Sequence, residues 1–171
     1  MFALAYYFLL LLAILVCSSS TSSGSSTVVM ALALAQSYGP AVNNAMAKQI
    51  AAGALNHAKT NFWNVAVAIV DTHGMLIYYE MMDDTQTGSS DICVEKAKSS
   101  ARFRRPTKVF EEGIVNGGRT AFLSFGVNMC EGGIPIVKGG KVIGGVGVSG
   151  VNSDQDAACA EAGLACLLAD I

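Results

Sequence analysis

The sequence predicts an α+β fold, in mixed α/β layers, with about five mainly antiparallel strands and helices packed on the sheet. Three observations support this prediction. Strand pairs joined by short turns occur twice, segments with helical periodicity lie between them, and no strand–helix–strand unit repeats. The 171 residues fit one domain, and the 52% of hydrophobic residues are enough to form a sizeable core.

The first half of the domain contains one helix and one hairpin. Small and apolar residues recur at helical spacing over residues 40–60, which predicts a helix. Residues 64–71 form an apolar run typical of a buried strand. Thr72, His73 and Gly74 predict a tight turn, after which residues 75–82 return as the partner strand.

The second half adds helices on both sides of a second hairpin. Ser90 or Asp91 is a suitable cap for a helix that runs to about Arg104, where Pro106 ends it. The remaining predicted elements are a helical turn over 106–112, a weaker strand over 123–129, a hairpin within 132–150 and a terminal helix over 153–168.

Residues 132–150 are unusually rich in glycine, with eight glycines in 19 residues. Glycine weakens a strand, so this density indicates either a close helix-on-sheet contact or the floor of a pocket. Residues 145–150 match G-x-G-x-x-G, but a dinucleotide site also needs a second parallel strand after the helix, and none is predicted.

The chain divides into three segments. Residues 1–17 are almost wholly apolar and predict a signal peptide or an N-terminal anchor, and residues 18–29 predict a Ser-rich linker before the domain at 30–171. We therefore expect a secreted or membrane-anchored protein, with membrane contact only through residues 1–17 if they are not cleaved. If translation starts at Met30, we expect a cytoplasmic protein. The net charge of −2 argues against nucleic-acid binding.

The five cysteines include no C-x-x-C pair, so a zinc site is not expected. Two interpretations stay open for the four cysteines of the domain. They are small buried hydrophobes, or a disulfide joins Cys93 to Cys130 or links another pair across elements. The four residues are Cys93, Cys130, Cys159 and Cys166.

Basic residues are concentrated in one segment. Six of the 11 lysines and arginines lie between Lys96 and Lys108, with no acidic residue among them. If the helix continues, Lys98, Arg102 and Arg105 share one face, which is either a solvated surface or a clamp for carboxylates or phosphates. Thr107 would add a hydroxyl to such a clamp.

Other polar residues have both structural and functional interpretations. Ser153 is a good N-cap, and Asp154 and Asp156 suit the first turn of a helix, or one of them acts as an acid or base. Ser149 would contribute a pocket hydroxyl, with no base in view for a hydrolase triad. His57 and His73 are weak candidates for a haem or metal ligand, with no further metal ligands apparent.

Several of these segments resemble the GlcG/HbpS family of haem-binding or haem-degrading-like domains, which also occur as the C-terminal part of PduO-type proteins. The matching segments, within about 32–168, are 67–71 with Gly74, 96–107, 132–136, 143–150, and Gln155-Asp156 with Ala162-Gly163. The resemblance implies a five-stranded antiparallel sheet with helices, homo-oligomers, and in some members haem or corrinoid binding. Neither histidine lies inside the matching motifs, so no axial ligand is implied.

We therefore predict a small oligomeric module that binds haem or a similar planar anionic tetrapyrrole and takes part in redox or haem handling. The candidate ligand-binding residues are Lys96, Arg102, Arg105, Thr107, Gly132, Gly133, Pro135, Gly145, Gly147 and Ser149. One alternative is an enzyme acting on a small carboxylate or phosphate metabolite, with Asp154 or Asp156 as acid or base and Ser149 nearby. A second alternative is a domain that serves only assembly.

Overall fold

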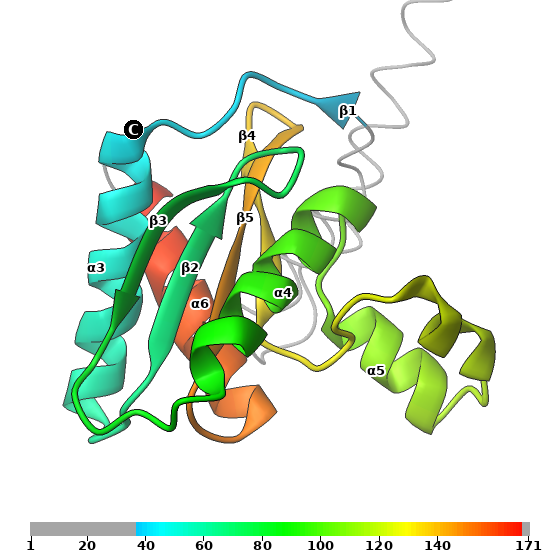
Figure 1. The fold of residues 1–171 in the computed structure, drawn as a ribbon. Coiled ribbons are helices and arrows are strands. Elements are labelled where there is room, and N and C mark those ends of the chain that lie inside the picture. Colours follow the sequence, from blue (N-terminus) through cyan, green and yellow to red (C-terminus); the bar gives the residue numbers. More distant parts are fainter. Residues whose placement is uncertain (1–36, 169–171) are drawn as a thin grey trace, which may run out of the picture. The chain divides into compact units, whose positions relative to one another are not determined.

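The computed structural model describes residues 37–168. The predicted N-terminal segment 1–17, the linker 18–29 and Met30 lie outside the described residues. The predicted α+β class is confirmed by a five-stranded mixed sheet with helices on it (Figure 1). The elements are β1 (Ser37–Tyr38), α3 (Asn44–Thr60), β2 (Ala66–Val70), β3 (Leu76–Met81), α4 (Ser89–Phe103), α5 (Lys108–Val115), the 3-10 helix η1 (Thr120–Phe125), β4 (Gly133–Lys138), β5 (Lys141–Ser149) and α6 (Ser153–Leu168).

The centre of the sheet is β5, the Gly-rich strand. It pairs antiparallel with β4 through the predicted hairpin and antiparallel with β2, which in turn pairs with β3. The short strand β1 adds a parallel pairing at the start of β5, where Ser37 aligns with Lys141. The sheet is therefore mainly antiparallel, as the sequence predicts, and the two-residue β1 carried no sequence signal.

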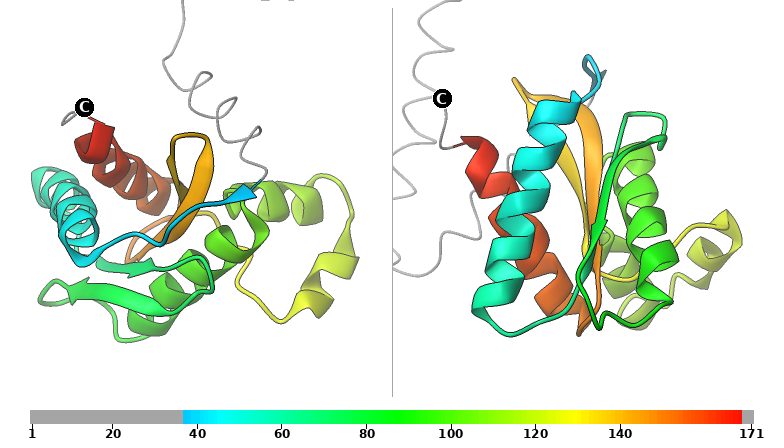
Figure 2. Two further views of the ribbon diagram at one scale, coloured as in Figure 1. Left: turned by 90° about the horizontal axis from the view of Figure 1, so that it is seen from above. Right: turned by 60° about the vertical axis from the view of Figure 1, so that its left-hand side comes forward.

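The sheet has one helical layer on each face, as Figure 2 shows. Side chains of alternate strand residues point to opposite faces. In β2, Val67 and Ile69 join the larger hydrophobic cluster, which contains buried residues of α3 and α6. Ala66, Ala68 and Val70 face α4 in a second cluster. The β2 side chains that face α4 are smaller than those that face α3 and α6, so α4 lies closer to the sheet.

The small residues of α6 pack against α3. A Cβ built on Gly53 would lie 2.6 Å from the Sγ atom of Cys166, and one built on Gly163 would lie 2.5 Å from the carbonyl oxygen of Ile50. The two helices thus need glycine at both positions to approach this closely. The small residues of the terminal helix therefore serve its packing against α3 within the chain.

One predicted strand is wrong. Residues 123–125 belong to η1 and residues 126–129 follow it, so none of them forms a strand. Here Phe122 and Phe125 contact each other and reach Phe110 and Phe103, so an aromatic cluster replaces the backbone pairing that a strand would need. Residues 108–131, hereafter the arm, extend beside the helical layer of α4 in Figure 1.

The four cysteines of residues 37–168 are free thiols, so no disulfide joins any of them. Cys93 and Cys159 are buried, as the hydrophobic interpretation predicts, whereas Cys130 and Cys166 are exposed. Burial raises the pKa of Cys93 to about 12 and that of Cys159 to about 11. Within residues 37–168, no helix combines the length and the apolar character needed to cross a membrane.

Candidate functional site

The basic segment does not form one face. Lys96 points inward and is 2% exposed, whereas Arg102 and Arg105 are exposed near the end of α4. Lys98 pairs with Glu95 one turn away, at 2.7 Å between Nζ and Oε1. The position of Lys96 gives no support to its predicted ligand-binding role, because a buried ammonium cannot reach a ligand on the surface.

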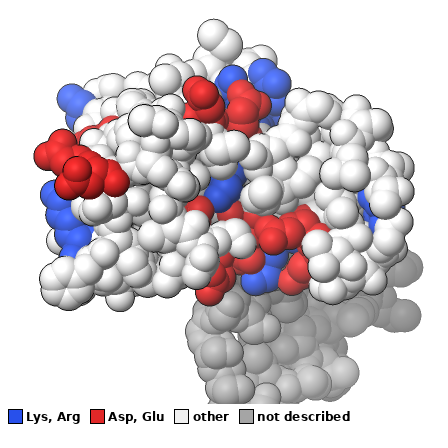
Figure 3. Space-filling model, turned by 60° about the horizontal axis from the view of Figure 1, so that its bottom comes forward, with Lys and Arg blue, Asp and Glu red and all other residues white. Residues whose placement is uncertain are grey.

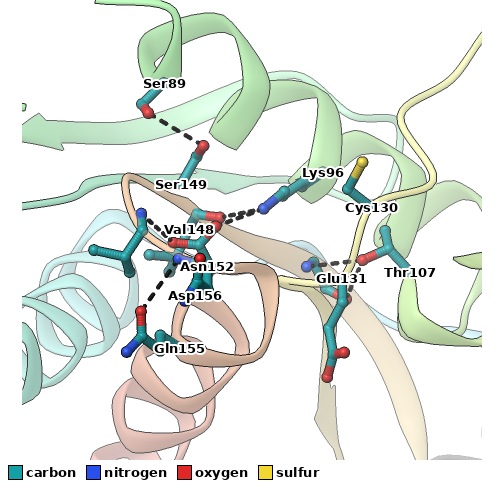
Figure 4. Close-up of polar contacts among 12 residues, drawn as sticks. Ser89, Lys96, Thr107, Cys130, Glu131, Val148, Ser149, Asn152, Gln155 and Asp156 are labelled. Atoms are coloured by element: carbon teal, nitrogen blue, oxygen red, sulfur yellow. Dashed lines mark hydrogen bonds and ion pairs between the residues drawn. The ribbon is translucent and has the colours of Figure 1, made fainter. Parts of the chain in front are cut away.

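A buried ion pair joins Lys96 of α4 to Asp156 of α6 (Figure 4). We call this pair, with the Val148 carbonyl and the Val151 N–H that bond to it, the polar junction. Lys96 Nζ donates to Asp156 Oδ2 at 2.7 Å and to the Val148 carbonyl at 3.1 Å. The backbone N–H of Val151 donates to the other carboxylate oxygen at 3.2 Å. Both charged side chains are at most 3% exposed, so the pair is closed to solvent.

Burial raises the pKa of the Asp156 carboxyl above its ordinary value, and the hydrogen bond and charge of Lys96 oppose that rise. The prediction of Asp156 as an acid or base acting on a ligand is therefore not supported by its position. Asp154 is exposed in the first turn of α6. Ser149 is buried, and its hydroxyl bonds to that of Ser89 at 3.3 Å (Figure 4).

Thr107 and the adjacent glycines fix the base of the arm. The N–H of Gly133 donates to Thr107 Oγ1 at 3.0 Å, and the N–H of Thr107 donates to the Gly133 carbonyl at 2.9 Å. Gly132 has φ +121°, and a Cβ there would lie 2.8 Å from Lys96 Nζ. Lys108 and Glu131 pair at 2.9 Å across the two ends of the arm. The polar groups of Thr107 and Gly133 therefore bond to each other within the chain and not to a ligand.

Two glycines of β5, Gly145 and Gly147, lie under α4. A Cβ on Gly145 would collide with the Ala97 carbonyl, and one on Gly147 with the Cys93 carbonyl. Gly133 on β4 faces the carbonyl of Lys96 in the same way, and Pro135 is buried opposite Gly145. Of the two interpretations of the Gly-rich segment, the structure shows the helix-on-sheet contact. These contacts account for the glycines without a ligand, and the close ligand approach at these residues stays a prediction.

The second polar region lies where the β2–β3 turn meets the end of α4, and we call it the turn site. Its residues are Tyr38, Asp71, Thr72, His73, Met75, Arg102 and Arg104. Arg102 Nε donates to the His73 carbonyl at 2.9 Å, joining residues 29 positions apart. Figure 1 shows the β2–β3 turn beside the end of α4, with β1 close by.

The imidazole of His73 projects from this turn. Its side chain is 86% exposed, and its Nδ1 lies 3.3 Å from Thr72 Oγ1 and 4.0 Å from Asp71 Oδ2. Asp71 Oδ1 accepts from the N–H groups of His73 and Met75, both at 2.8 Å, which fixes the turn backbone. A proton on Nδ1 directed at these oxygens leaves the Nε2 lone pair for a metal.

Two further arginines follow Arg102 at the end of α4. Arg104 lies over the ring of Tyr38, 5.2 Å from its centroid, and Arg105 lies 5.7 Å from the centroid of Phe110. The hydroxyl of Tyr38 donates to the Arg102 carbonyl at 2.7 Å and so satisfies an acceptor at the helix end. The turn site thus combines an exposed imidazole, guanidinium groups and aromatic surface.

His57 has a different environment, half-buried on α3 with its ring 5.9 Å from that of Trp63. In the part of the chain that the structure describes, no three His, Cys, Asp or Glu side chains form a group that could hold a metal ion. Within residues 37–168, neither histidine is therefore part of such a group.

The opposite end of the molecule carries acidic side chains. Figure 3 shows the molecule with the bottom of Figure 1 turned forward, and several groups of Asp and Glu side chains lie on this face. Lys and Arg side chains are visible on the same face, so it carries charges of both signs.

Sequence reasoning named His73 and Arg102 separately but missed that they meet. It also missed Tyr38, Asp71 and Met75 as members of the site. Asp71 precedes His73 by two residues and Met75 by four. This spacing indicates a turn in which the Asp side chain accepts hydrogen bonds from the backbone. Nothing local indicated Tyr38, which lies 64 residues before Arg102 and meets it only through β1.

The fold and these residues define a small α/β domain of a known family. The family model "Haem degrading protein HbpS-like" matches residues 42–165. The chain therefore belongs to the HbpS-like family, which confirms the resemblance drawn from the sequence.

Relatives show how far the similarity extends. The chain is 43% identical to Protein GlcG of Escherichia coli (strain K12) over 105 residues, which are 61% of this chain and 78% of that protein. A crystal structure of Klebsiella pneumoniae protein ORFY is 28% identical, covers 78% of this chain and 96% of its own, and has a TM-score of 0.71. A crystal structure of a PduOC–haem complex is 27% identical, covers 74% of this chain and 94% of its own, and has a TM-score of 0.67.

Proposed function

We propose that this protein binds haem, or a similar planar anionic tetrapyrrole, at the turn site. The observation that carries the proposal is the exposed His73 imidazole, with its Nδ1 facing Asp71 and Thr72, beside the guanidinium of Arg102. The PduOC–haem complex supports the ligand class, because that protein shares this fold and the ligand is present in its structure.

The residues present fit the chemistry of the group. Neutral imidazole is a common axial ligand of haem iron, and a second hydrogen-bond partner on the other ring nitrogen fixes its orientation. Haem would bring the iron and its redox chemistry, and the chain would supply the ligand atom, the counter-charges and the apolar contacts. Arg102 and Arg105 are exposed, and their planar guanidinium groups match carboxylates such as propionates.

The enzyme alternative gains no such observation. Asp156 is held in the polar junction and Ser149 is bonded to Ser89, so neither group is open to a metabolite. Asp154 is exposed, but it lies at the start of α6, away from the arginines of the turn site. The geometry therefore favours binding over acid–base catalysis.

Titration of the full-length chain with haem, followed by visible absorption, tests the proposal. We expect a saturable Soret shift in the wild type. In His73→Ala we expect binding to be lost or at least about tenfold weaker, because the variant lacks the proposed axial ligand. A tenfold loss corresponds to about 1.4 kcal/mol. His57→Ala is the matched control and should bind like the wild type. Absence of a saturable shift, or equal binding by His73→Ala and the wild type, would overturn the proposal.

The contribution of charge is tested separately. We expect Arg102→Ala/Arg105→Ala to weaken haem binding and to reduce its dependence on salt. Lys48→Ala/Lys59→Ala removes the same charge from the exposed face of α3 and should leave the affinity unchanged. Equal losses in the two double variants would show that net charge, and not the turn site, attracts the ligand.

A further inference from the structure

We propose that the outer edge of β3 is an interaction surface at which a second copy of this chain adds its own β3 in the antiparallel direction. The two five-stranded sheets would then join into one continuous sheet. This inference needs no ligand and does not depend on the proposed function. It follows from the free backbone groups of β3, the side chains beside them and the charges at the two ends of the strand.

Strand β3 is one edge of the sheet that residues 37–168 build (Figure 1). It pairs with β2, and no other described strand pairs with it. An unpaired edge presents N–H and C=O groups to which another strand can bond, and proteins often protect it with Lys or Pro. Residues 76–82 contain neither. The one shift in the β2–β3 register leaves Ile77 unpaired near the start of the strand, so the rest of the edge is regular.

The pairing with β2 determines which backbone groups of β3 face outward. The N–H of Met82 donates to the carbonyl of Val65 at 3.1 Å, which continues the β2–β3 ladder by one residue. Hydrogen-bonded and non-hydrogen-bonded pairs alternate along an antiparallel ladder, so Glu80 also bonds to β2. The N–H and C=O groups of Tyr79 and Met81 therefore point away from β2, toward the free edge.

Apolar side chains accompany these outward groups. Met75, Leu76 and Tyr79 are 64%, 51% and 37% exposed. Leu76 and Tyr79 align with Val70 and Ala68 of β2, so both lie on the α4 face of the sheet. A second β3 strand would cover part of this apolar surface and bond the outward backbone groups in the same contact.

The two ends of β3 carry opposite charge, which identifies the partner as a second copy. The strand begins at the β2–β3 turn, where Arg102 bonds to the His73 carbonyl, and exposed Asp83 and Asp84 follow its end. In an antiparallel pair of identical strands, the basic start of each strand meets the acidic end of the other. The same pairing is repeated by a two-fold axis, so one surface serves both copies.

The register follows from the same strand. Pairing Tyr79 with Tyr79 of the second copy joins their outward backbone groups and sets Glu80 opposite Tyr78 of the second copy. The Tyr78 hydroxyl already donates to Glu80 within the chain at 2.7 Å, so these two side chains suit each other as neighbours. Pairing Tyr79 with Met81 instead would set the two Glu80 carboxylates directly opposite each other, which is unfavourable.

Hydrogen exchange of single amides in the full-length chain without haem tests the pairing. Glu80 and Met82 bond to β2 in each copy, so their amides should be protected at every concentration. We expect the amides of Tyr79 and Met81 to slow by at least about tenfold as light scattering shows the mass to double. Fast exchange of these two amides in the dimer, or a chain that stays monomeric at all concentrations, would overturn the inference.

A proline variant separates the edge from other surfaces. Tyr79→Pro removes an outward N–H but keeps the bonds to β2, because proline is tolerated on an edge strand where the N–H faces solvent. We expect a monomer with an unchanged circular dichroism spectrum. Tyr79→Thr removes the same ring but keeps the N–H, and it should still form the dimer. A dimer that persists unchanged in Tyr79→Pro contradicts the pairing.

A charge variant gives a second test that does not alter the strand. We expect Asp83→Asn/Asp84→Asn to weaken the dimer and to reduce its dependence on salt, because the acidic end of β3 is lost. Asp154→Asn/Glu161→Gln removes the same charge from exposed residues of α6 and should dimerise like the wild type. Equal weakening by both double variants would show that net charge, and not the β3 edge, governs association, and would overturn the proposed surface.

Discussion

Lys96 and Arg102 lie six residues apart on α4 and belong to the same basic segment, yet their environments are opposite. Lys96 is enclosed in the polar junction with Asp156, whereas Arg102 is exposed at the turn site and bonds only to a backbone carbonyl of another element. A buried charge must be compensated inside the protein, and it then serves the fold. An exposed charge keeps donors for a ligand. The comparison teaches that burial, and not residue type, decides which member of the segment is available.

The largest expected effect comes from breaking the polar junction. We expect Asp156→Ala to lower the free energy of unfolding by about 3–5 kcal/mol, because it leaves the Lys96 ammonium buried without a counter-charge. Urea unfolding followed by circular dichroism measures the change. Asp154→Ala, in the same helical turn but exposed, should change it by less than about 0.5 kcal/mol.

A compensating variant sharpens this prediction. Lys96→Met/Asp156→Leu removes both charges, and we expect it to be more stable than Asp156→Ala because no unpaired charge remains buried. A double variant as unstable as the single one would show that the packing of these side chains, rather than their charge, holds the junction together.

The next effect concerns the glycine that brings α4 onto β5. We expect Gly147→Ala to lower the free energy of unfolding by about 1–3 kcal/mol, because a Cβ there collides with the backbone carbonyl of Cys93. Gly88→Ala is the control, since a Cβ at that position meets no atom within 4 Å. A neutral result for Gly147→Ala would mean that α4 does not pack on the sheet as described.

A smaller effect is expected at the turn site. We expect Arg102→Ala to lower the free energy of unfolding by about 1 kcal/mol, the net contribution of one hydrogen bond, here to the carbonyl of His73. Hydrogen exchange should also become faster in the β2–β3 turn. Lys98→Ala removes a charge from the same helix without touching the turn, so its turn amides should exchange as in the wild type.

The last prediction changes reactivity rather than stability. In a Cys17→Ser variant, which leaves the four cysteines of the domain, we expect two thiols to react rapidly with a disulfide reagent at pH 8. They are Cys130 and Cys166, which are exposed. Burial raises the pKa of Cys93 to about 12, so its thiol stays protonated in the folded state and should react only after unfolding. Four equally fast thiols would contradict the buried positions of Cys93 and Cys159.

Sequence periodicity predicted most of the fold but not the arm. The helix over 153–168 and the hairpin within 132–150 follow from patterns inside each segment, namely small-residue spacing and a Gly-Gly turn between apolar runs. Residues 123–129 have the apolar content of a strand, but Phe125 stacks on Phe103 of α4, and the preceding Phe122 contacts Phe110 of α5. No local pattern distinguishes these two outcomes, because the partners are distant in sequence.

Within the candidate site, single residues were predictable and their grouping was not. His73 was identified only as a weak candidate in a turn, and Arg102 was placed on one helix face with Lys98 and Arg105. The hydrogen bond from Arg102 to His73 requires the β2–β3 hairpin to end beside the last turn of α4, which the order of the strands in the sheet determines.

The sequence by itself determined the fold class, the family and the order of nearly all elements, because these depend on patterns within short segments. Only the tertiary structure decided what each polar residue does. It buried Lys96 against Asp156, covered Gly145 and Gly147 with α4, and placed His73 beside Arg102. The reason is physical: solvent exposure and the nearest charged partner are properties of the folded chain, and residues far apart in sequence set both.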